Sequence, residues 1–460
     1  MYQIDLNRPQ HVHFIGIGGI SMSGLAEILM NRGFAISGSD SKKSALTESL
    51  EERGARLYYG QRASNISDDI ELIVYSAAIH PDNPEYARGA SLGLPMLSRA
   101  ELLGQIMKGY PTAIAVAGTH GKTTTTSMLA HILMEANTDP TISVGGILPS
   151  IGGNIRVGNS DYFLTEACEY TNSFLSFFPT MAIILNMDAD HLDFFSGIEE
   201  IRESFRRFAL LVPEGGQVII SADTPHYEDI LKDLTCEKIT FSLTPEAADY
   251  WAENITSDEA GRPTFLVKCR GEEIGTFSLS VPGIHNVSNS LAAIAAGRIL
   301  SIPEETIKKA LLGFTGTDRR FQFKGEIGGV SIIDDYAHHP TEISATLTAA
   351  SAMAHKKLWC VFQPHTYSRT KALLHEFAEA LSKADEVVLA DIYAARENDD
   401  LGISSEVLQG KIQELGCPCA HFPTFDAIEA YLLTNAEPGD MILTMGAGDI
   451  FRVGEHLLGN

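Results

Sequence analysis

Residues 112–135 constrain the fold of this chain more than any other stretch. An apolar, β-branched run at residues 112–117 leads into Gly-Thr-His-Gly-Lys-Thr at residues 118–123, and a helix-forming stretch follows at residues 127–135. A strand, a glycine-containing loop and a helix in this order are typical of a phosphate loop. In such a loop N–H groups cradle phosphates, a lysine reaches the outer phosphates and a threonine hydroxyl binds Mg²⁺. Val116 replaces the first glycine of the usual G-x-x-x-x-G-K-[ST] pattern. A polar loop without a ligand is the alternative, but the preceding strand and the run of threonines favour ATP binding.

The size and charge of the chain limit its partners. Its 460 residues suffice for about three domains, each with its own core. A net charge of −25 argues against nucleic acid or an anionic membrane as a partner, because both need a basic face. No apolar run approaches the roughly 20 residues that span a bilayer. Cys417 and Cys419 fit two incidental thiols better than a redox or metal pair, so we expect reduced thiols and a cytoplasmic location.

The N-terminal segment has the pattern of a dinucleotide-type βαβ unit. We expect a strand, the turn Gly-x-Gly-Gly at residues 16–19, a helix at about residues 25–32 and a second strand. Ser21 stands where the third small residue of the pattern belongs, and Asp40 lies where an acidic residue usually meets a ribose hydroxyl. The pattern predicts a diphosphate at a helix N-terminus. Tight strand-to-helix packing without a ligand is the alternative.

Acidic residues near the ends of two later strands are candidates for binding Mg²⁺ beside the phosphate loop. Glu166 follows one apolar run, and the acidic segment at residues 186–193 follows another. The metal must bridge phosphates and protein oxygens, and such positions suit it. For Asp188 and Asp193, helix capping or solvation is at least as good an interpretation. His191 alone would be structural, but its place among acidic residues at a strand end makes it a candidate ligand.

The last third of the chain alternates apolar runs with helix-forming stretches. A strand at residues 358–362 and a helix at residues 370–383 predict a third α/β domain with a mostly parallel sheet. Polar clusters follow the expected strands, around His365 and around Asp391. Ligands bind beyond the carboxyl ends of such strands, so both clusters are candidate site walls. A loop of no function is an equal alternative for the Asp391 cluster.

Taken together, these motifs resemble the Mur ligases, ATP-dependent amide-forming enzymes of peptidoglycan synthesis. The resemblance covers essentially the whole chain. Its motifs occur in the same order, at residues 16–19, 118–124, 166–169, 186–193, 285–289, 319–321 and 335–340. The glycine turn and the run Phe-Gln-Pro-His-x-Tyr-Ser-Arg-Thr at residues 362–370 make the chain most similar to the branch that adds L-alanine to UDP-N-acetylmuramate.

The resemblance implies an α/β fold with three domains. These are a Rossmann-like UDP-sugar-binding domain at residues 1–107, a central P-loop ATPase-type domain at residues 108–316 and a Rossmann-like amino-acid and ADP-binding domain at residues 317–460. The implied substrates are UDP-N-acetylmuramate, L-alanine and ATP, with two Mg²⁺ ions for which Mn²⁺ substitutes. The implied chemistry is phosphoryl transfer from ATP to a carboxylate, followed by attack of an amine on the acyl phosphate. A monomer or homodimer without nucleic acid or membrane partners is expected.

By the same resemblance, the candidate site residues fall into groups. The sugar nucleotide would be bound by Gly16, Gly18, Gly19, Ser21, Asp40 and Ser76. ATP would be bound by Gly118, Thr119, His120, Gly121, Lys122, Thr123, Thr124, Asn286, Asn289, Arg320 and Asp335. Mg²⁺ would be bound by Thr123, Glu166 and His191, and the amino acid by Tyr336, His338, His365 and Arg369. The expected catalytic residues are Lys122, Glu166, His191 and His338, the last as a general base or only as a binding residue.

Three other functions compete with this interpretation. A recycling ligase of the same family would add a preformed peptide to the same sugar nucleotide. A nicotinamide-dependent oxidoreductase would use the glycine turn but would leave the phosphate loop unexplained. A P-loop binding module would use ATP turnover only to change conformation.

Overall fold

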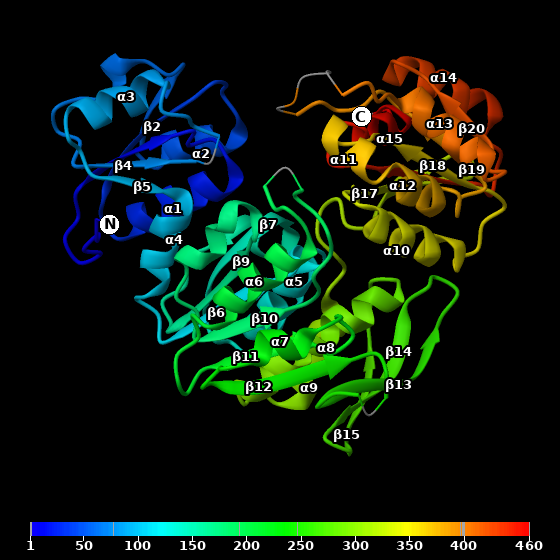
Figure 1. Cartoon of the computed structure of the whole chain (residues 1–460), viewed down its shortest axis with the longest axis horizontal. Coiled ribbons are helices and arrows are strands. Elements are labelled where there is room, and N and C mark those ends of the chain that lie inside the picture. The colour runs from blue at the N-terminus through cyan, green and yellow to red at the C-terminus, as the bar shows by residue number, and fades with distance from the viewer. Residues whose placement is uncertain are drawn as a thin grey trace. The chain divides into compact units, whose positions relative to one another are not determined.

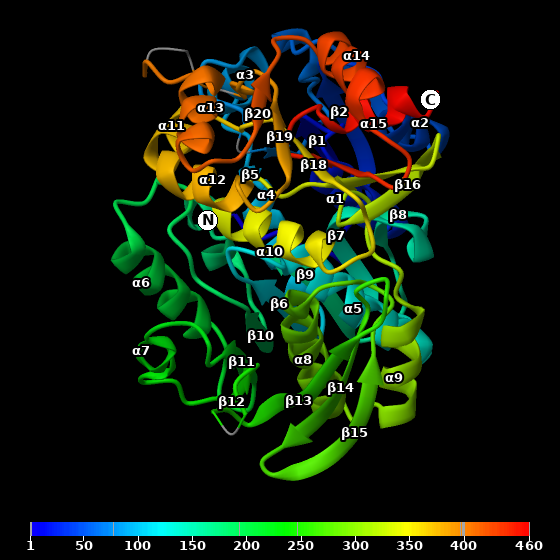
Figure 2. The same ribbon diagram turned by 90° about the vertical axis from the view of Figure 1, so that its right-hand side faces the viewer.

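The computed structural model describes the chain in two compact units. Unit 1 comprises Met1–Met187, Glu200–Thr240 and Ala295–Leu300, and unit 2 comprises Asp188–Glu199, Phe241–Ile294 and Ser301–Asn460. The described residues are all those except Met1, Ala77, Asp193, Glu246, Arg396, residues 398–400 and Asn460. Figures 1 and 2 show the chain from two directions.

The first sheet of unit 1 is parallel throughout. Its strand order is β3-β2-β1-β4-β5, with helices between the strands (Figure 1). The strands are β1 (His11–Ile15), β2 (Ala35–Asp40), β3 (Arg56–Tyr59), β4 (Leu72–Tyr75) and β5 (Met96–Ser98). The helices are α1 (Ile20–Asn31), α2 (Ala45–Glu52), α3 (Pro84–Ser91) and α4 (Arg99–Met107). Parallel neighbours need crossover connections, so this sheet has the Rossmann-like arrangement that the βαβ pattern predicts, and its carboxyl edge carries the glycine turn.

The second sheet of unit 1 carries the phosphate loop. Its strands follow the order β11-β10-β6-β9-β7-β8, and α5 packs beside β9 and β7 (Figure 2). The strands are β6 (Thr112–Ala117), β7 (Thr141–Leu148), β8 (Gly153–Arg156), β9 (Tyr162–Ala167), β10 (Met181–Ile184) and β11 (Gln217–Ser221). The helices are α5 (Lys122–Glu135), the 3-10 helix η3 (Tyr170–Ser176), α6 (Ile198–Ala209) and α7 (Tyr227–Leu231). Because β6, β9 and β10 are parallel, the residues that follow them share one edge.

Unit 2 begins its regular structure at the end of β12 (Glu237–Ser242). There Phe241 and Ser242 pair with β13, which continues into an antiparallel ribbon. The ribbon strands are β13 (Tyr250–Ser257), β14 (Pro263–Cys269) and β15 (Glu272–Ser278), followed by α8 (Ile284–Ile299) and α9 (Glu304–Gly313).

The C-terminal sheet lies wholly in unit 2. Its order is β16-β17-β21-β18-β19-β20, parallel except for the β16–β17 hairpin. The strands are β16 (Gln322–Ile327), β17 (Val330–Asp335), β18 (Leu358–Phe362), β19 (Glu386–Leu389), β20 (Cys419–His421) and β21 (Met441–Met445). One core cluster joins the sheet to α10 (Pro340–Ser351), α12 (Leu374–Leu381) and α13 (Ser405–Glu414). A second core cluster joins the other face to α14 (Phe425–Asn435) and α15 (Phe451–Leu457) (Figure 2).

Two helices begin earlier than their sequences predict. α5 begins at Lys122 rather than at residue 127, because Thr125 and Thr126 are fully buried and packing outweighs their low helix propensity. α1 begins at Ile20 rather than near residue 25. Its first turns contain Ser21, Ser23 and Gly24, which give a weak helix signal, and Gly24 packs so closely that a Cβ would lie 2.8 Å from Ile155 Cδ1.

The strands of the last third are predicted better than its helix. The expected strand at residues 358–362 is confirmed as β18, and the mostly parallel sheet is confirmed. The expected single helix at residues 370–383 is wrong, because the chain forms α11 (Tyr367–Ala372) and then α12. Leu373 interrupts the helix with φ −115° and ψ 27°, and its side chain packs against the core. Cys417 and Cys419 are free and buried in that same core.

Candidate functional site

Two glycines and one asparagine shape the loop between β6 and α5. Gly118 and Gly121 have φ angles of 143° and 82°, which favour glycine. Asn186, shortly after β10, holds the loop from the other side. The His120 N–H donates to Asn186 Oδ1 at 2.8 Å, and the Asn186 side-chain amide donates to the His120 carbonyl at 3.0 Å. Because α5 starts at Lys122, its first N–H groups face this loop, which is the geometry of a phosphate site.

Lys122 is held beside the loop by carbonyl oxygens and one carboxylate. Its Nζ donates to the carbonyls of Gly118 and Thr119, and to Glu169 Oε2 at 3.1 Å. Only 16% of the Lys122 side chain and 3% of the Glu169 side chain are exposed. Burial by itself lowers the pKa of Lys122, but the Glu169 carboxylate together with Cys168 and Glu166 outweighs burial and leaves this pKa above its ordinary value. The ammonium group is therefore charged beside the loop.

Thr123 and Glu166 form a pair of oxygen donors at the start of α5. Thr123 Oγ1 donates to Glu166 Oε2 at 3.1 Å, while Glu166 Oε1 accepts the Gly145 N–H at 2.5 Å. A Cβ on Gly145 would lie 2.7 Å from Glu166 Oε2, so glycine is needed for β7 to approach this carboxylate. Thr124, the next residue of α5, is partly buried. Hydroxyl and carboxylate oxygens are ligands that Mg²⁺ prefers, so the donor set fits that ion.

The glycine turn after β1 is closed by an aspartate. The Gly18 N–H donates to Asp40 Oδ2 at 2.8 Å, and a Cβ on Gly18 would lie 2.8 Å from the same oxygen. Gly16 has φ 84°, and a Cβ there would lie 3.3 Å from Ser76 Oγ. The turn thus brings together residues at the carboxyl ends of three different strands, β1, β2 and β4. The other two predicted residues stand at the start of α1, Gly19 as its N-cap and Ser21 in its first turn.

In unit 2 the two asparagines of α8 face the same way, as their spacing predicts. Asn289 Nδ2 donates to Asn286 Oδ1 at 3.1 Å, and Asn286 Nδ2 donates to the Pro282 carbonyl at 2.7 Å. Both side chains are buried. Buried amides need hydrogen-bond partners, and these two have them. The pair is therefore an ordered, buried arrangement and not a solvated helix face.

Asp335 ends β17 and is held by the backbone on both sides. Its carboxylate accepts the Phe321 N–H at 2.8 Å and the Ala337 N–H at 2.7 Å. Burial raises the pKa of Asp335 to about 6, and Arg320 acts in the opposite direction. The Arg320 guanidinium lies over the Tyr336 ring, 5.3 Å from its centroid. Asp335, Arg320 and Tyr336 therefore form one cluster.

His338 presents a neutral imidazole in the same region. Its Nδ1 lies 3.1 Å from the Tyr336 carbonyl, which can only accept, so the proton of the neutral ring is on Nδ1 and a lone pair is on Nε2. Burial lowers the pKa of His338 to about 4, against the pull of Glu342. The ring lies edge-on to Tyr336 at 5.5 Å and 6.0 Å from the ring of His365. This imidazole is therefore neutral at pH 7, with the lone pair on Nε2.

Arg369 is shared between a carboxylate and an imidazole. Its Nε and Nη2 donate to Asp190 Oδ1 at 3.1 and 2.9 Å, and Nη1 lies 3.3 Å from His365 Nδ1. Burial opposes ionisation of Asp190, but the Arg369 guanidinium holds its pKa well below the usual range. Burial also lowers the pKa of His365 to about 4, and its ring stacks on Tyr393 at 5.5 Å. Since a guanidinium has five N–H groups, one on each terminal nitrogen remains for a ligand.

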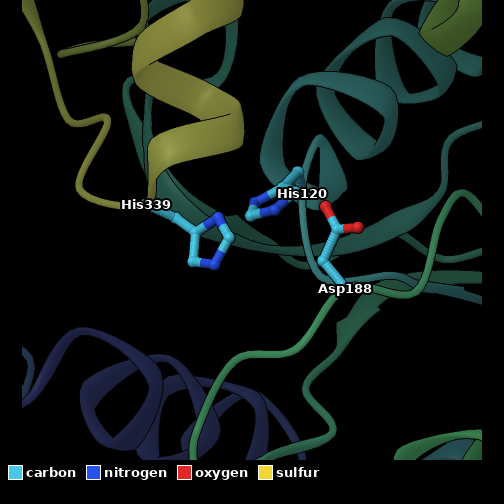
Figure 3. Close-up of side chains that lie close together, drawn as sticks. All are labelled: His120, Asp188 and His339. Carbon is cyan, nitrogen blue, oxygen red and sulfur yellow. The ribbon is translucent and has the colours of Figure 1, made fainter. Parts of the chain in front are cut away.

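Two further residues of unit 2 have ligand-type atoms close together. Asp188 and His339 place such atoms within 4.8 Å of each other. Figure 3 draws both side chains. His120, drawn in the same figure, belongs to unit 1 and is part of the phosphate loop. His191 adopts φ 53°, and its N–H donates to Asp190 Oδ1 at 2.7 Å. Asp193, the other acidic candidate, lies outside the described residues.

Sequence reasoning missed the residues that hold the site residues in place. Glu169, Asn186 and Asp190 all lie in the motifs, yet only the structure shows that they bind Lys122, the phosphate loop and Arg369 respectively. Gly145 gave no signal, because nothing in the sequence places it against Glu166.

Comparison with known proteins places this geometry in a family. Three family models match the chain: the Mur ligase family catalytic domain over residues 11–111, the Mur ligase middle domain over residues 116–297, and the Mur ligase glutamate ligase domain over residues 319–448. The chain belongs to the Mur ligase family. The α/β fold expected from the sequence, with the three-domain Mur ligase architecture, is thereby confirmed.

Individual relatives are similar over the full length. UDP-N-acetylmuramate–L-alanine ligase of Lachnospira eligens is 60% identical over 458 residues, which cover 100% of each chain. The crystal structure of UDP-N-acetylmuramate-alanine ligase from Thermotoga maritima has a TM-score of 0.82 at 28% identity and covers 98% of each chain. The structure of a murein peptide ligase from Psychrobacter arcticus has a TM-score of 0.72 at 27% identity, again over 98% of each chain. Within the described part of the chain, no helix has the length and apolarity to cross a membrane.

Proposed function

We propose that this chain is an ATP-dependent ligase that joins L-alanine to the carboxylate of UDP-N-acetylmuramate, in the synthesis of peptidoglycan precursors. The observation that carries the proposal is the full-length identity of 60% to a ligase with that name. The lower TM-score of the murein peptide ligase, 0.72 against 0.82, favours this reaction over addition of a preformed peptide. The enzyme works in the cytoplasm as a monomer or homodimer, with domains at residues 1–107, 108–316 and 317–460.

The first chemical step activates the carboxylate. A carboxylate oxygen attacks the γ-phosphorus of ATP, the bond from that phosphorus to the β,γ-bridging oxygen breaks, and ADP leaves with the electron pair. Lys122 offsets charge on the transferred group, since it is a buried ammonium beside the loop amides. Thr123, Glu166 and His191 would hold Mg²⁺, which would supply further positive charge beside the phosphates. Two such ions would act, and Mn²⁺ would substitute for them.

The second step forms the amide. The alanine nitrogen attacks the acyl carbon, the bond to the phosphate oxygen breaks and phosphate leaves. The amine must lose a proton, and His338 Nε2 accepts it, since its lone pair is free when Nδ1 bonds the Tyr336 carbonyl. The remaining N–H groups of Arg369 bind the alanine carboxylate, with Asp190 and His365 fixing the guanidinium plane. Tyr336 and His365 form the walls of the pocket.

The two nucleotides are bound by backbone-rich sites. ATP is bound by residues 118–124 and, at its base and ribose or its phosphates, by Asn286, Asn289, Arg320 and Asp335. The sugar nucleotide is bound by the glycine turn, with its diphosphate at the start of α1 and its ribose at Asp40. An acyl phosphate hydrolyses in water, so closure of the site around the substrates is part of this proposal.

Phosphate release in a matrix of UDP-sugars against amine acceptors tests the proposal. Release should require both UDP-N-acetylmuramate and L-alanine. Release that needs a tri- or tetrapeptide in place of L-alanine would assign the recycling reaction. Release with ATP alone would assign a regulatory P-loop module, and reduction of NAD(P)⁺ would assign an oxidoreductase.

A further inference from the structure

The segment that follows β19 is the polar cluster around Asp391, which the mechanism above does not use. From the sequence, a wall of a site and a loop of no function are equal alternatives for it. In the structure it lies against the turn between β18 and α11, which carries His365 and leads to Arg369. The described residues of the segment, 391–395 and 397, contact this turn through backbone, ring and carboxylate groups.

Two backbone hydrogen bonds join Tyr393 to the turn on either side of His365. The Thr366 N–H donates to the Tyr393 carbonyl at 2.9 Å, and the Tyr393 N–H donates to the Pro364 carbonyl at 2.8 Å. Thr366 has φ 67°, a conformation that a β-branched residue rarely adopts. Such a conformation persists only where its surroundings hold it, and the bond to Tyr393 does so here. Because Thr366 is the N-cap of α11, this bond also fixes where the helix begins.

The side chain of Tyr393 stacks on the imidazole of His365. The two ring centroids are 5.5 Å apart, and the ring planes differ by 22°. Gly448 lets the tyrosine ring come this close, since a Cβ on Gly448 would lie 3.1 Å from Tyr393 Cγ. His365 Nδ1 in turn lies 3.3 Å from Arg369 Nη1. The Tyr393 ring therefore fixes the plane of an imidazole that contacts the guanidinium.

Glu397 holds the same turn at its other end. Its Oε2 accepts the Ser368 N–H at 2.9 Å, and its Oε1 accepts the Ser368 hydroxyl. Ser368 lies in the first turn of α11, where backbone N–H groups have no partner within the helix. Arg369 is the next residue along the chain. Asp190 bonds the guanidinium itself, whereas Tyr393 and Glu397 fix the imidazole and the backbone beside it.

We infer that Tyr393 and Glu397 are positioning residues of the amino-acid site, which hold His365 and α11 so that Arg369 presents its remaining N–H groups to the alanine carboxylate. The inference rests on the proposed function, which assigns that carboxylate to Arg369. A guanidinium binds a carboxylate through two parallel N–H bonds, so a small change in its direction weakens both. All the contacts described lie within unit 2, whereas the glycine turn and the phosphate loop belong to unit 1. Loss of these contacts should therefore affect binding of the amino acid more than binding of either nucleotide.

Steady-state kinetics of the full-length enzyme test the inference through three KM values, for L-alanine, ATP and UDP-N-acetylmuramate. Tyr393→Ala should raise the KM for L-alanine about tenfold and leave the other two within about twofold of wild type. Tyr393→Phe keeps the stacked ring and should have a nearly wild-type KM for L-alanine. Glu397→Gln keeps the size of the side chain but loses its charge, so that KM should rise about threefold. Phe323→Ala, which removes a 63% exposed aromatic side chain from β16, is the control and should change none of the three.

A second measurement shows whether Tyr393 acts through His365. In a His365→Ala background, Tyr393→Ala should raise the KM for L-alanine by less than about a further twofold, because no imidazole remains for the ring to hold. The same rise of about tenfold in that background would mean that Tyr393 acts independently of His365, and it would overturn the inference.

The remaining outcomes separate this inference from the proposed function. Equal rises in all three KM values would indicate general damage, and unchanged values would leave the segment a loop of no function; either result overturns the inference. If Tyr393→Ala does not fold, Tyr393→Leu decides, because leucine fills much of the same space without a ring to stack. Wild-type enzyme that releases no phosphate with L-alanine would refute the proposed function. Wild-type enzyme that uses L-alanine, with variants that keep its KM, would refute only the positioning role.

Discussion

The glycine turn after β1 and the phosphate loop after β6 have the same backbone plan and opposite electrostatics. Each joins a parallel strand to a helix N-terminus through glycines. At the glycine turn the side chain nearest the loop is a carboxylate, Asp40, bonded to the Gly18 N–H. At the phosphate loop it is an ammonium, Lys122, supported by Glu169 and accompanied by the donor pair of Thr123 and Glu166.

This difference in charge distinguishes a site that only binds a diphosphate from a site at which a phosphoryl group is transferred. Backbone N–H groups suffice for a diphosphate that stays intact, and an aspartate beside them can select a ribose. A phosphate that is transferred develops charge on its oxygens, so a cation and metal ligands are needed there. Substitutions in the phosphate loop should therefore stop turnover and leave sugar-nucleotide binding intact. Substitutions in the glycine turn should weaken sugar-nucleotide binding and leave the chemistry at the phosphate loop intact.

The largest effect is expected at Lys122. Lys122→Met should lower kcat by about a thousandfold or more, because the buried ammonium is lost where charge develops. Calorimetry should still find UDP-N-acetylmuramate bound within about twofold of wild type, because the glycine turn is unchanged. Lys238→Met, at an exposed position of β12, is the control and should leave kcat unchanged. Near-wild-type turnover by Lys122→Met would remove the lysine from the chemistry.

A smaller loss is expected at Glu166. Glu166→Gln keeps the shape that Gly145 and Thr123 contact but removes the charge that suits a divalent ion. We expect kcat to fall about a hundredfold and the Mg²⁺ concentration at half-maximal rate to rise. Steady-state rates over a Mg²⁺ titration measure both. Glu214→Gln, at an exposed loop, is the control. An unchanged Mg²⁺ dependence with a reduced kcat would mean that Glu166 only supports the loop.

Gly18→Ala should affect the glycine turn and leave the phosphate loop unchanged. The new methyl group would lie 2.8 Å from Asp40 Oδ2 and push this carboxylate away from the turn. The KM for UDP-N-acetylmuramate should rise about tenfold, while the KM for ATP stays within about twofold. Gly153→Ala is the control, since a Cβ at Gly153 meets nothing within 4 Å. Equal changes in both KM values would show that the two sites are not independent.

The sequence predicts the two turns well because their signals are local. A glycine that needs positive φ, a strand before it and a helix after it all lie within about 20 residues. Local sequence signals do not predict where helices begin. The buried threonines of α5 and the serines and glycine of α1 are weak helix formers, and packing against the sheets makes them helical. The break at Leu373 has the same origin, since its side chain turns into the core.

Side-chain partners across the fold are harder to predict. Arg369 was expected to bind the amino acid, and the structure shows that it also bonds Asp190, 179 positions away in sequence. Glu166 meets Gly145 because β7 and β9 are neighbours in the sheet, and the sequence does not show that order. The residue types of a site follow from its chemistry, but the groups that orient them follow from strand order and packing.

The smallest effect is expected on the pH dependence of folding stability below neutral pH. It arises from the buried histidines at the predicted amino-acid site of unit 2, and not from the phosphate loop. Burial lowers the pKa of His338 and of His365 to about 4, whereas the unfolded chain protonates histidine near pH 6.5. Between these pH values the unfolded state binds more protons, so the free energy of unfolding falls as the pH drops. Asp335 acts oppositely: burial raises its pKa to about 6, so the folded state binds its proton more tightly and gains stability on acidification. Two histidines act against this one aspartate, so the net effect of acidification is a loss of folding stability.

Removing one of these histidines should flatten the pH dependence. His338→Gln should decrease the slope of unfolding free energy between pH 6.5 and pH 5 by about 1 kcal/mol per pH unit, because one proton fewer is taken up on unfolding. Urea unfolding at several pH values measures the slope. His375→Gln, at an exposed position of α12, is the control and should leave it unchanged. UDP-N-acetylmuramate binding over the same range should change little, since the predicted residues of the glycine turn include no histidine. If the affinity for UDP-N-acetylmuramate falls as steeply with pH as the free energy of unfolding does, acid affects the whole chain. The glycine turn and the amino-acid end of unit 2 would then not differ in their response to pH.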